Sequence, residues 1–168
     1  MAFGFERISI EQLRKDWEKL GWPMTGENSL EDAAIIMPRR ATSYSAGYDI
    51  FAPINFVLYP GESITVPTGL KIHIPIGYFL MIAPRSGLGF KYQIGLANTI
   101  GIIDADYYDN PDNEGHILVK LVNRGDKDCF INAGQAFCQG ILMQHSFFVG
   151  EFAANETRKG GIGSTDKE

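Results

Sequence analysis

The sequence predicts an all-β fold, a sandwich or a barrel, over most of its length. From residue 34 onward, short apolar runs are interrupted by Pro, Gly, Asn and Asp. Turn signals such as Tyr59–Glu62 and Asn132–Gly134 separate these runs at fairly even spacing, which is typical of all-β domains rather than of alternating strands and helices. The chain has no internal repeat. The expected strands lie at 50–58, 64–66, 70–74, 78–83, 117–122 and 136–143.

One helix is expected before the strands, at residues 8–20. Its apolar positions recur every three or four residues, a serine precedes them, and a glycine and a proline follow them. These residues are Ile10, Leu13, Trp17 and Leu20, with Ser9, Gly21 and Pro23 at the ends. A helix this short needs a surface to dock on. We therefore expect an N-terminal helical extension at 1–33, a β-barrel at 34–154, and a polar, glycine-rich C-terminal arm at 155–168 that is flexible.

Composition excludes several classes of protein. The chain has 168 residues, enough for one domain, and a net charge of −5 argues against a partner such as duplex nucleic acid. The two cysteines, Cys129 and Cys138, are interpreted as small buried hydrophobes in a reducing compartment. His73, His116 and His145 show no metal-ligand spacing. With no signal segment and no membrane-spanning apolar run, we expect a soluble, cytoplasmic protein without a membrane partner.

The segment from Asn98 to Tyr107 is the strongest functional signal. An apolar strand passes through Gly101 and stops at Asp104, directly after two isoleucines. A carboxylate at the edge of an apolar wall has a basicity that burial and neighbouring charge can tune. Tyr107 follows as a flat ring suited to pack against a sugar or a base. The segment predicts a nucleotide pocket with a general base.

Three further segments carry groups suited to phosphate. Pro84–Gly89 combines a guanidinium, a hydroxyl and backbone N–H groups, but an ordinary β-turn with a surface arginine is an equal alternative. Ala46–Asp49 is either part of this site or a turn in which Asp49 caps backbone donors. Gly160–Thr165 is similar to a phosphate-cradling loop, although it lacks the spacing and the lysine of a P-loop; its alternative is a disordered tail.

Taken together and in order, five segments resemble the motifs of the trimeric dUTP diphosphatase (dUTPase) family. They are 46–49, 84–87, 98–107, 134–139 and 160–165, and the resemblance covers residues 37–165. It implies a jelly-roll β-barrel that forms a homotrimer with active sites shared between subunits. The implied reaction is Mg²⁺-assisted hydrolysis of dUTP to dUMP and pyrophosphate, which limits uracil in DNA and supplies dUMP for dTMP synthesis.

The resemblance also implies roles for individual residues. Asp104 matches the base that activates a water for attack on the α-phosphorus, and Tyr107 matches the ring that excludes a 2′-hydroxyl. Asn98, Gly101 and Ile103 match the hairpin that binds uracil. Asp49 matches a metal-site carboxylate that acts through water. The expected phosphate contacts are Arg85, Ser86, Gly87 and Gln139, and the arm that closes over the nucleotide carries Arg158, Ile162, Gly163, Ser164 and Thr165.

The sequence departs from the family pattern at several positions. Residues 108–115 are longer and more acidic than the usual turn, and we interpret them as a structural surface hairpin. Ala136 and Ile162 replace a basic residue and a phenylalanine, and Arg158 lies one residue closer to the glycines. Two alternatives stay open: a dCTP deaminase of the same fold, and a non-catalytic nucleotide-binding regulator.

Overall fold

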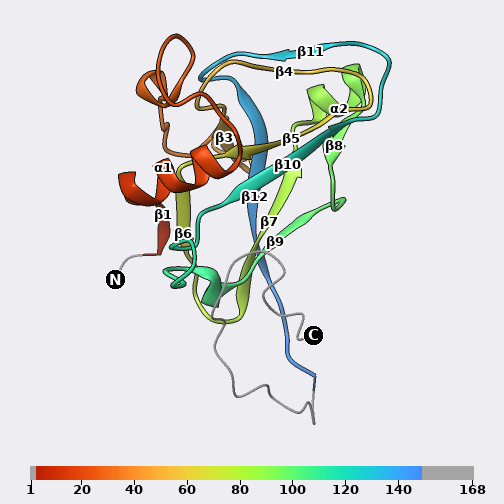
Figure 1. The fold of residues 1–168 in the computed structure, drawn as a ribbon. Coiled ribbons are helices and arrows are strands. Elements are labelled where there is room, and N and C mark those ends of the chain that lie inside the picture. Colours follow the sequence, from red (N-terminus) through yellow and green to blue (C-terminus); the bar gives the residue numbers. More distant parts are fainter. Residues whose placement is uncertain (1–2, 149–168) are drawn as a thin grey trace, which may run out of the picture.

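The computed structural model describes residues 3–148, so the predicted arm residues Arg158 and 162–165 lie outside the described part. Within that part the chain is mostly β, with two α-helices (Figure 1). The main sheet has the order β2-β3-β12-β7-β9, and a second sheet has the order β5-β10-β8. The pairs β1-β6 and β11-β4 complete the described sheets. This arrangement agrees with the all-β prediction.

The strands are short and antiparallel, as the even spacing of turn signals predicts. Their bounds are β1 (Gly4–Arg7), β2 (Arg39–Arg40), β3 (Tyr48–Phe51), β4 (Phe56–Leu58), β5 (Ser63–Pro67), β6 (Leu70–His73), β7 (Tyr78–Pro84), β8 (Ile94–Leu96), β9 (Gly101–Ile103), β10 (Leu118–Asn123), β11 (Cys129–Ile131) and β12 (Ala136–Gln144). The longest ladder joins β12 to β7, from Cys138 opposite Pro84 to Gln144 opposite Tyr78.

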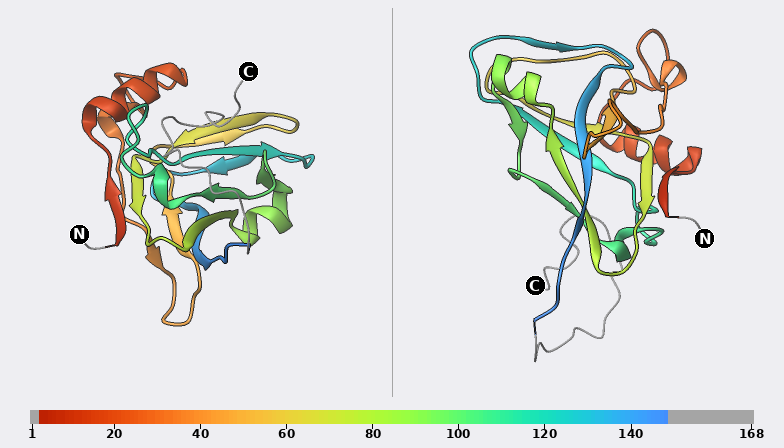
Figure 2. Two further views of the ribbon diagram at one scale, coloured as in Figure 1. Left: turned by 90° about the horizontal axis from the view of Figure 1, so that it is seen from below. Right: turned by 180° about the vertical axis from the view of Figure 1, so that it is seen from behind.

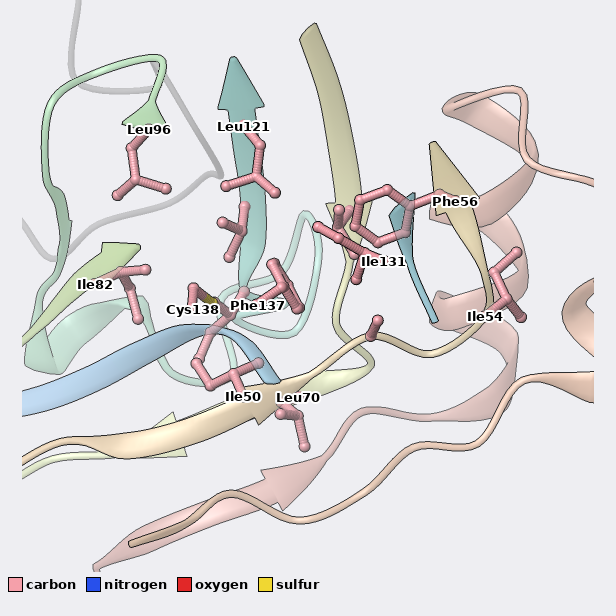
Figure 3. Packing of buried hydrophobic residues seen from close by; sticks show 14 of the residues in the cluster. Ile50, Ile54, Phe56, Leu70, Ile82, Leu96, Leu121, Ile131, Phe137 and Cys138 are labelled. Atoms are coloured by element: carbon pink, nitrogen blue, oxygen red, sulfur yellow. The ribbon is translucent and has the colours of Figure 1, made fainter. Parts of the chain in front are cut away.

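Buried side chains from these strands build one hydrophobic core (Figure 3). Phe137 and Cys138 are buried on β12, beside Ile50 of β3 and Phe56 of β4. The rings of Phe56 and Phe137 meet edge to face with centroids 6.2 Å apart. Both cysteines are free and buried, as predicted, and burial raises the pKa of the Cys138 thiol well above its usual range. This core holds β7 and β12, which carry the candidate site.

The predicted N-terminal helix is present as α1 (Ile10–Lys19). It begins two residues later than expected, because Ser9 is the N-cap and accepts a hydrogen bond from the backbone N–H of Gln12 (3.1 Å). Trp17 is fully buried and donates from Nε1 to the carbonyl of Pro23 (2.8 Å). Figure 2 shows α1 on one flank of the sheets. The helix therefore docks on its own chain.

Strand β1 precedes α1 and was not predicted. It pairs with β6 from Gly4 opposite His73 to Arg7 opposite Leu70. Its four residues, Gly-Phe-Glu-Arg, contain too few apolar positions to show a period, so only the partner strand makes this segment extended. The division at residue 33 stays a prediction, but the segment before it contributes a strand to the fold.

Two further expectations differ from the structure. The run 50–58 is two strands, β3 and β4, because Pro53 between them cannot donate to a ladder. The segment after Pro84, for which an ordinary β-turn was one of two alternatives, is helix α2 (Ser86–Tyr92). Gly87 and Gly89 disfavour a helix by intrinsic propensity, and tertiary contacts override it. Leu88 of α2 is buried. Within residues 3–148, neither α-helix has the length or the apolar content needed to cross a membrane.

Candidate active site

Residues that the sequence assigns to nucleoside binding line one cavity of about 170 Å³. Its wall comes from β9, from the turn before β9, and from β7, β8 and β10. The lining residues are Ile82, Leu96, Asn98, Gly101, Ile102, Ile103, Tyr107, Leu118, Val119 and Lys120. The structure thus places Asn98, Gly101, Ile103 and Tyr107 together. The cavity is mainly apolar with few polar groups, which is typical of a small-molecule site.

A tight turn and a close strand contact shape this cavity. The backbone N–H of Ile100 donates to the carbonyl of Asn98 (2.7 Å), and Thr99 has φ of 67°, an uncommon value for a β-branched residue. A Cβ on Gly101 would lie 3.0 Å from the Cβ of Ile82 on β7. Glycine at this position therefore lets β9 approach β7 closely enough to form the wall.

Asp104 stands at the end of β9, where the strand gives way to the 3₁₀ helix η2 (Ala105–Tyr107). Its backbone carbonyl accepts a hydrogen bond from the N–H of Tyr107 (3.1 Å), so the carboxylate and the ring belong to one rigid turn. The side chain of Asp104 is exposed in the single chain.

Tyr107 is held at both ends, and only 4% of it is exposed. Its hydroxyl donates to the carbonyl of His116 (3.0 Å) and accepts from Nδ2 of Asn113 (2.8 Å). Nδ2 of Asn110 donates to the backbone carbonyl of Tyr107 (2.9 Å). The sequence singled out Tyr107 but missed these two asparagines, and the only signal was the unusual length of the segment that carries them.

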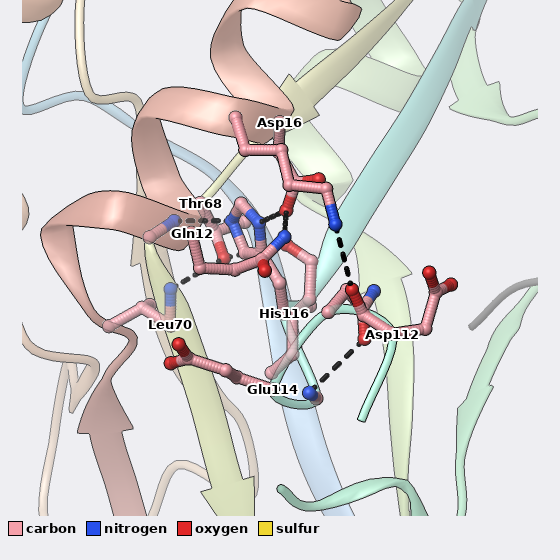
Figure 4. A network of polar contacts seen from close by, with 12 residues as sticks. Gln12, Asp16, Thr68, Leu70, Asp112, Glu114 and His116 are labelled. Carbon is pink, nitrogen blue, oxygen red and sulfur yellow. Dashed lines mark hydrogen bonds and ion pairs between the residues drawn. The ribbon is translucent and has the colours of Figure 1, made fainter. Parts of the chain in front are cut away.

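Residues 108–115 are not the simple surface hairpin that the sequence suggested, because Asn110 and Asn113 are buried and the segment is bound to α1 (Figure 4). The backbone N–H and the Oγ of Ser9 both donate to the carboxylate of Glu114 (2.9 and 2.6 Å). The side-chain hydrogen bond from Ser9 is the main cause that lowers the pKa of Glu114. The segment therefore binds the start of α1.

A buried pair, Asp16 and His116, makes a second connection between α1 and this segment. Nε2 of His116 accepts from the backbone N–H of Gly69 (2.9 Å), so the ring proton lies on Nδ1, which donates to Asp16 (2.6 Å). Burial opposes ionisation of Asp16, but hydrogen bonds from His116 and Gln12 outweigh it and lower the pKa of the carboxyl. His116 shows no metal-ligand spacing in the sequence, and the structure places it in this polar network.

The predicted phosphate donors lie at the other end of β7. Arg85 follows the strand directly and forms an ion pair with Asp49 of β3, which is buried. Asp49 lies opposite Gln139 of β12, whose Nε2 donates to the carbonyl of Pro84 (3.5 Å). Any side chain at Gly47 would overlap the amide of Gln139. Ser86 and Gly87 occupy the first turn of α2, where backbone N–H groups lack intrahelical acceptors.

Asp104 and Arg85 lie far apart within one chain. Ile103 lies opposite Leu80 of β7, so Asp104 comes level with Phe79, whereas Arg85 follows the far end of the strand. Six residues of extended strand separate these levels by about 20 Å. The structure therefore places Asp104 at one end of β7, named here the nucleoside end after its predicted role, and Arg85 at the other, the predicted phosphate end.

Comparison with known proteins identifies the family. The dUTPase family model matches residues 33–166. The chain belongs to the dUTPase family. The deoxyuridine 5′-triphosphate nucleotidohydrolase of Lactococcus lactis is 41% identical over 138 residues, covering 80% of this chain and 91% of that protein. The protein of the same name from Burkholderia ambifaria is 41% identical over 138 residues, covering 78% of this chain and 89% of that protein.

Solved dUTPase structures share the fold. The dUTPase from Streptococcus mutans has a TM-score of 0.66 and 33% identity, with 88% of this chain and 99% of that chain covered. A dUTPase variant from phage phi11 of S. aureus, which coordinates a structural Mg(II) ion, has a TM-score of 0.60 and 21% identity, covering 90% of this chain and 99% of that chain. These matches confirm the predicted family, the jelly-roll fold and an enzyme of the dUTP diphosphatase class.

Proposed function

We propose that this dUTPase-family chain hydrolyses dUTP to dUMP and pyrophosphate, which limits uracil in DNA and supplies dUMP for dTMP synthesis. The observation that carries the proposal is the convergence of Asn98, Gly101 and Tyr107 on one cavity beside Asp104. The polar edge of Asn98 and the backbone near Gly101 suit uracil, and the ring of Tyr107 suits a sugar without a 2′-hydroxyl. Asp104 then lies where the α-phosphate leaves the nucleoside.

Asp104 is proposed to act as the general base. It accepts a proton from a water, whose oxygen forms a bond to the α-phosphorus while the bond to the α,β-bridging oxygen breaks, and pyrophosphate leaves. A triphosphate repels an incoming hydroxide, so positioning and electrostatic donors supply much of the rate enhancement. Arg85, Ser86 and Gly87 are the proposed donors, and Gln139 is a proposed polar contact near the phosphates.

The donor set at the phosphate end fits Mg²⁺. Among the described residues, no three His, Cys, Asp or Glu side chains are grouped to form a protein cage for a metal. Mg²⁺ is usually held by phosphate oxygens, retained waters and one or two carboxylates. Asp49 is a carboxylate beside the proposed phosphate donors, and we propose that it contacts the metal through water. The metal would neutralise phosphate charge when bound.

A homotrimer with shared sites is proposed because one chain does not bring all of the proposed site residues together. Asp104, beside which the nucleotide would bind, lies about 20 Å along β7 from Arg85 of the same chain. A neighbouring subunit can bring its own Arg85 to that nucleotide, since a cyclic oligomer repeats one heterologous contact. The C-terminal arm with Arg158, Ile162, Gly163, Ser164 and Thr165 is proposed to close over the same site.

The test is a comparison of substrates. The protein is incubated separately with dUTP, dCTP, dTTP, dATP and dGTP, and both pyrophosphate and ammonia are assayed. Pyrophosphate release from dUTP alone is expected. Ammonia from dCTP would instead support the deaminase alternative, which uses a glutamate for proton transfer at the base. Tight dUTP binding without pyrophosphate release would indicate a regulator.

A further inference from the structure

We propose that Asn113 is a positioning residue that sets the sugar specificity of the cavity by holding the ring of Tyr107. This inference rests on the proposed function, because it concerns a nucleoside in the cavity beside Asp104. It also assigns a role to residues 108–115, the segment that departs from the family pattern and that the proposed reaction leaves unused.

The contacts of Asn113 are directed at Tyr107. Its Nδ2 donates to the hydroxyl of Tyr107 (2.8 Å), and its Oδ1 accepts from Nδ2 of Asn110 (2.8 Å) and from the N–H of Gly115 (3.1 Å). Only 7% of Asn113 is exposed. A buried amide with both of its ends bonded has one orientation. The hydroxyl of Tyr107 is therefore fixed between an amide donor and the carbonyl of His116.

Helix α1 fixes the segment on both sides of Asn113. Nζ of Lys15 donates to the carbonyl of Asp112 (3.3 Å), Ser9 donates to Glu114, and Asp16 binds His116. Figure 4 shows Asp16 of α1 facing His116, with Asp112 and Glu114 of the segment close by. Asn113 is thus attached to a buried framework rather than to a free loop, and it can transmit that rigidity to the ring.

Rigidity of the ring determines discrimination between deoxyribose and ribose. A ring locked against the sugar excludes an extra hydroxyl by overlap, whereas a ring that can tilt makes room for it. Loosening the ring of Tyr107 should therefore weaken the packing against dUTP modestly. It should also improve the use of UTP relative to that of dUTP. The expected signature is a raised KM for dUTP with kcat nearly unchanged, together with a lower ratio of kcat/KM for dUTP over UTP.

The experiment is a double-mutant cycle with a matched control. Asn113→Ala is expected to lower the dUTP/UTP ratio about three- to tenfold, the effect of one lost buried hydrogen bond. In the Tyr107→Phe background, which has no hydroxyl to hold, the same substitution should change the ratio little further. The control is Asn123→Ala, since Asn123 is also buried, donates to the carbonyls of Leu58 and Lys127 (both 2.8 Å), and is the last residue of β10.

Three outcomes decide the proposal. It stands if only Asn113→Ala lowers the ratio and Tyr107→Phe removes that effect. It is overturned if Asn123→Ala lowers the ratio equally, or if Asn113→Ala acts fully in the Tyr107→Phe background. Equilibrium Kd values for dUMP and UMP, measured without turnover, separate this test from the proposed function. A wild-type protein that binds neither nucleotide contradicts the proposed function, whereas an unchanged dUMP preference in Asn113→Ala contradicts the role of Asn113.

Discussion

The two ends of β7 are built in different ways. At the phosphate end, Arg85 directly follows β7 and forms an ion pair with Asp49 of β3, which lies opposite Gln139 of β12 in the same sheet. At the nucleoside end, Tyr107 is held by a segment that is itself bound to α1, far away in the sequence. The positions of the residues at the phosphate end follow from the register of the sheet. The position of Tyr107 at the nucleoside end also depends on the N-terminal extension, which takes no part in the proposed reaction.

The residues proposed to act on the substrate are therefore distinct from the residues that hold them in place. Arg85 is already paired with a buried carboxylate, so its position is fixed before any ligand binds. Asp104 is exposed, while the ring three residues later is among the most constrained side chains of the site. Variants at the phosphate end and at Asp104 should therefore change turnover. Variants in the α1 network should change stability and sugar selection instead.

The largest effect is expected for Asp104→Asn. Removal of the proposed general base should lower kcat by about 10²–10⁴-fold while the Kd for dUTP changes little, because the amide keeps the size of the carboxylate. The measurement is steady-state pyrophosphate release combined with calorimetric binding. Asp106→Asn, two residues away and also exposed, is the matched control and should keep its turnover. Near-normal turnover of Asp104→Asn would show that the assigned base is wrong.

Mixing two inactive variants tests whether the two ends act in different subunits. Asp104→Asn and Arg85→Ala are refolded together in equal amounts, and pyrophosphate release is measured. Random assembly of a shared site should restore about one quarter of the wild-type activity, because that fraction of sites combines both intact ends. No recovery, with both variants folded and assembled, would place the two ends in one chain. Arg85→Lys, which keeps a cation beside Asp49, repeats the test if Arg85→Ala fails to fold.

Asp16→Asn should alter stability with a defined pH dependence. The amide oxygen can still accept from His116 and Gln12, so the substitution removes mainly charge, with an expected cost of about 1–2 kcal/mol at pH 7. Because folding lowers the pKa of Asp16 below its usual 3.8, this contribution is present above that pH and is lost as the pH falls through the folded value. Urea unfolding of both proteins between pH 7 and 3 measures the difference.

The control for Asp16→Asn is Glu18→Gln on the exposed side of α1, which should change the unfolding free energy by less than about 0.5 kcal/mol. A wild-type advantage that stays constant down to acid pH would contradict an ionised Asp16 in the network.

The smallest effect is expected for Tyr108→Phe. The hydroxyl of Tyr108 donates to Glu6 of β1 (2.8 Å), and this hydrogen bond, with burial and nearby acidic charge, raises the pKa of Tyr108 to about 12. The contribution is present below about pH 10 and is lost as the pH rises through 12. Its loss should cost less than about 1 kcal/mol, because the contact is near the surface. Ultraviolet titration of the tyrosines, compared between wild type and variant, identifies the group.

Tyr44→Phe is the matched control, since Tyr44 is 98% exposed, and it should leave stability unchanged. If Tyr108→Phe removes no high-pH titration, Tyr108 is not held by Glu6 as described.

The sequence predicted those elements that depend mainly on neighbouring residues in the chain. The apolar spacing of Ile10, Leu13 and Trp17 predicts α1, and a serine before it predicts the cap. The break after Ile103 predicts that a strand ends at a carboxylate, and β9 ends there. Asn98, Gly101 and Tyr107 lie within ten residues of one another, so one turn brings them to one cavity.

Tertiary structure alone decided the features that join distant segments. Strand β1 forms because β6 pairs with it, and α2 forms despite two glycines because Leu88 is buried in the core. Pairing of Asp16 with His116 spans 100 positions, and no periodicity records such a contact. The sequence therefore predicted that Asp104 and Tyr107 carry the chemistry. Only the packed chain decided that Asn113 and α1 hold the ring in place, because long-range hydrogen bonds depend on which surfaces meet after the core has formed.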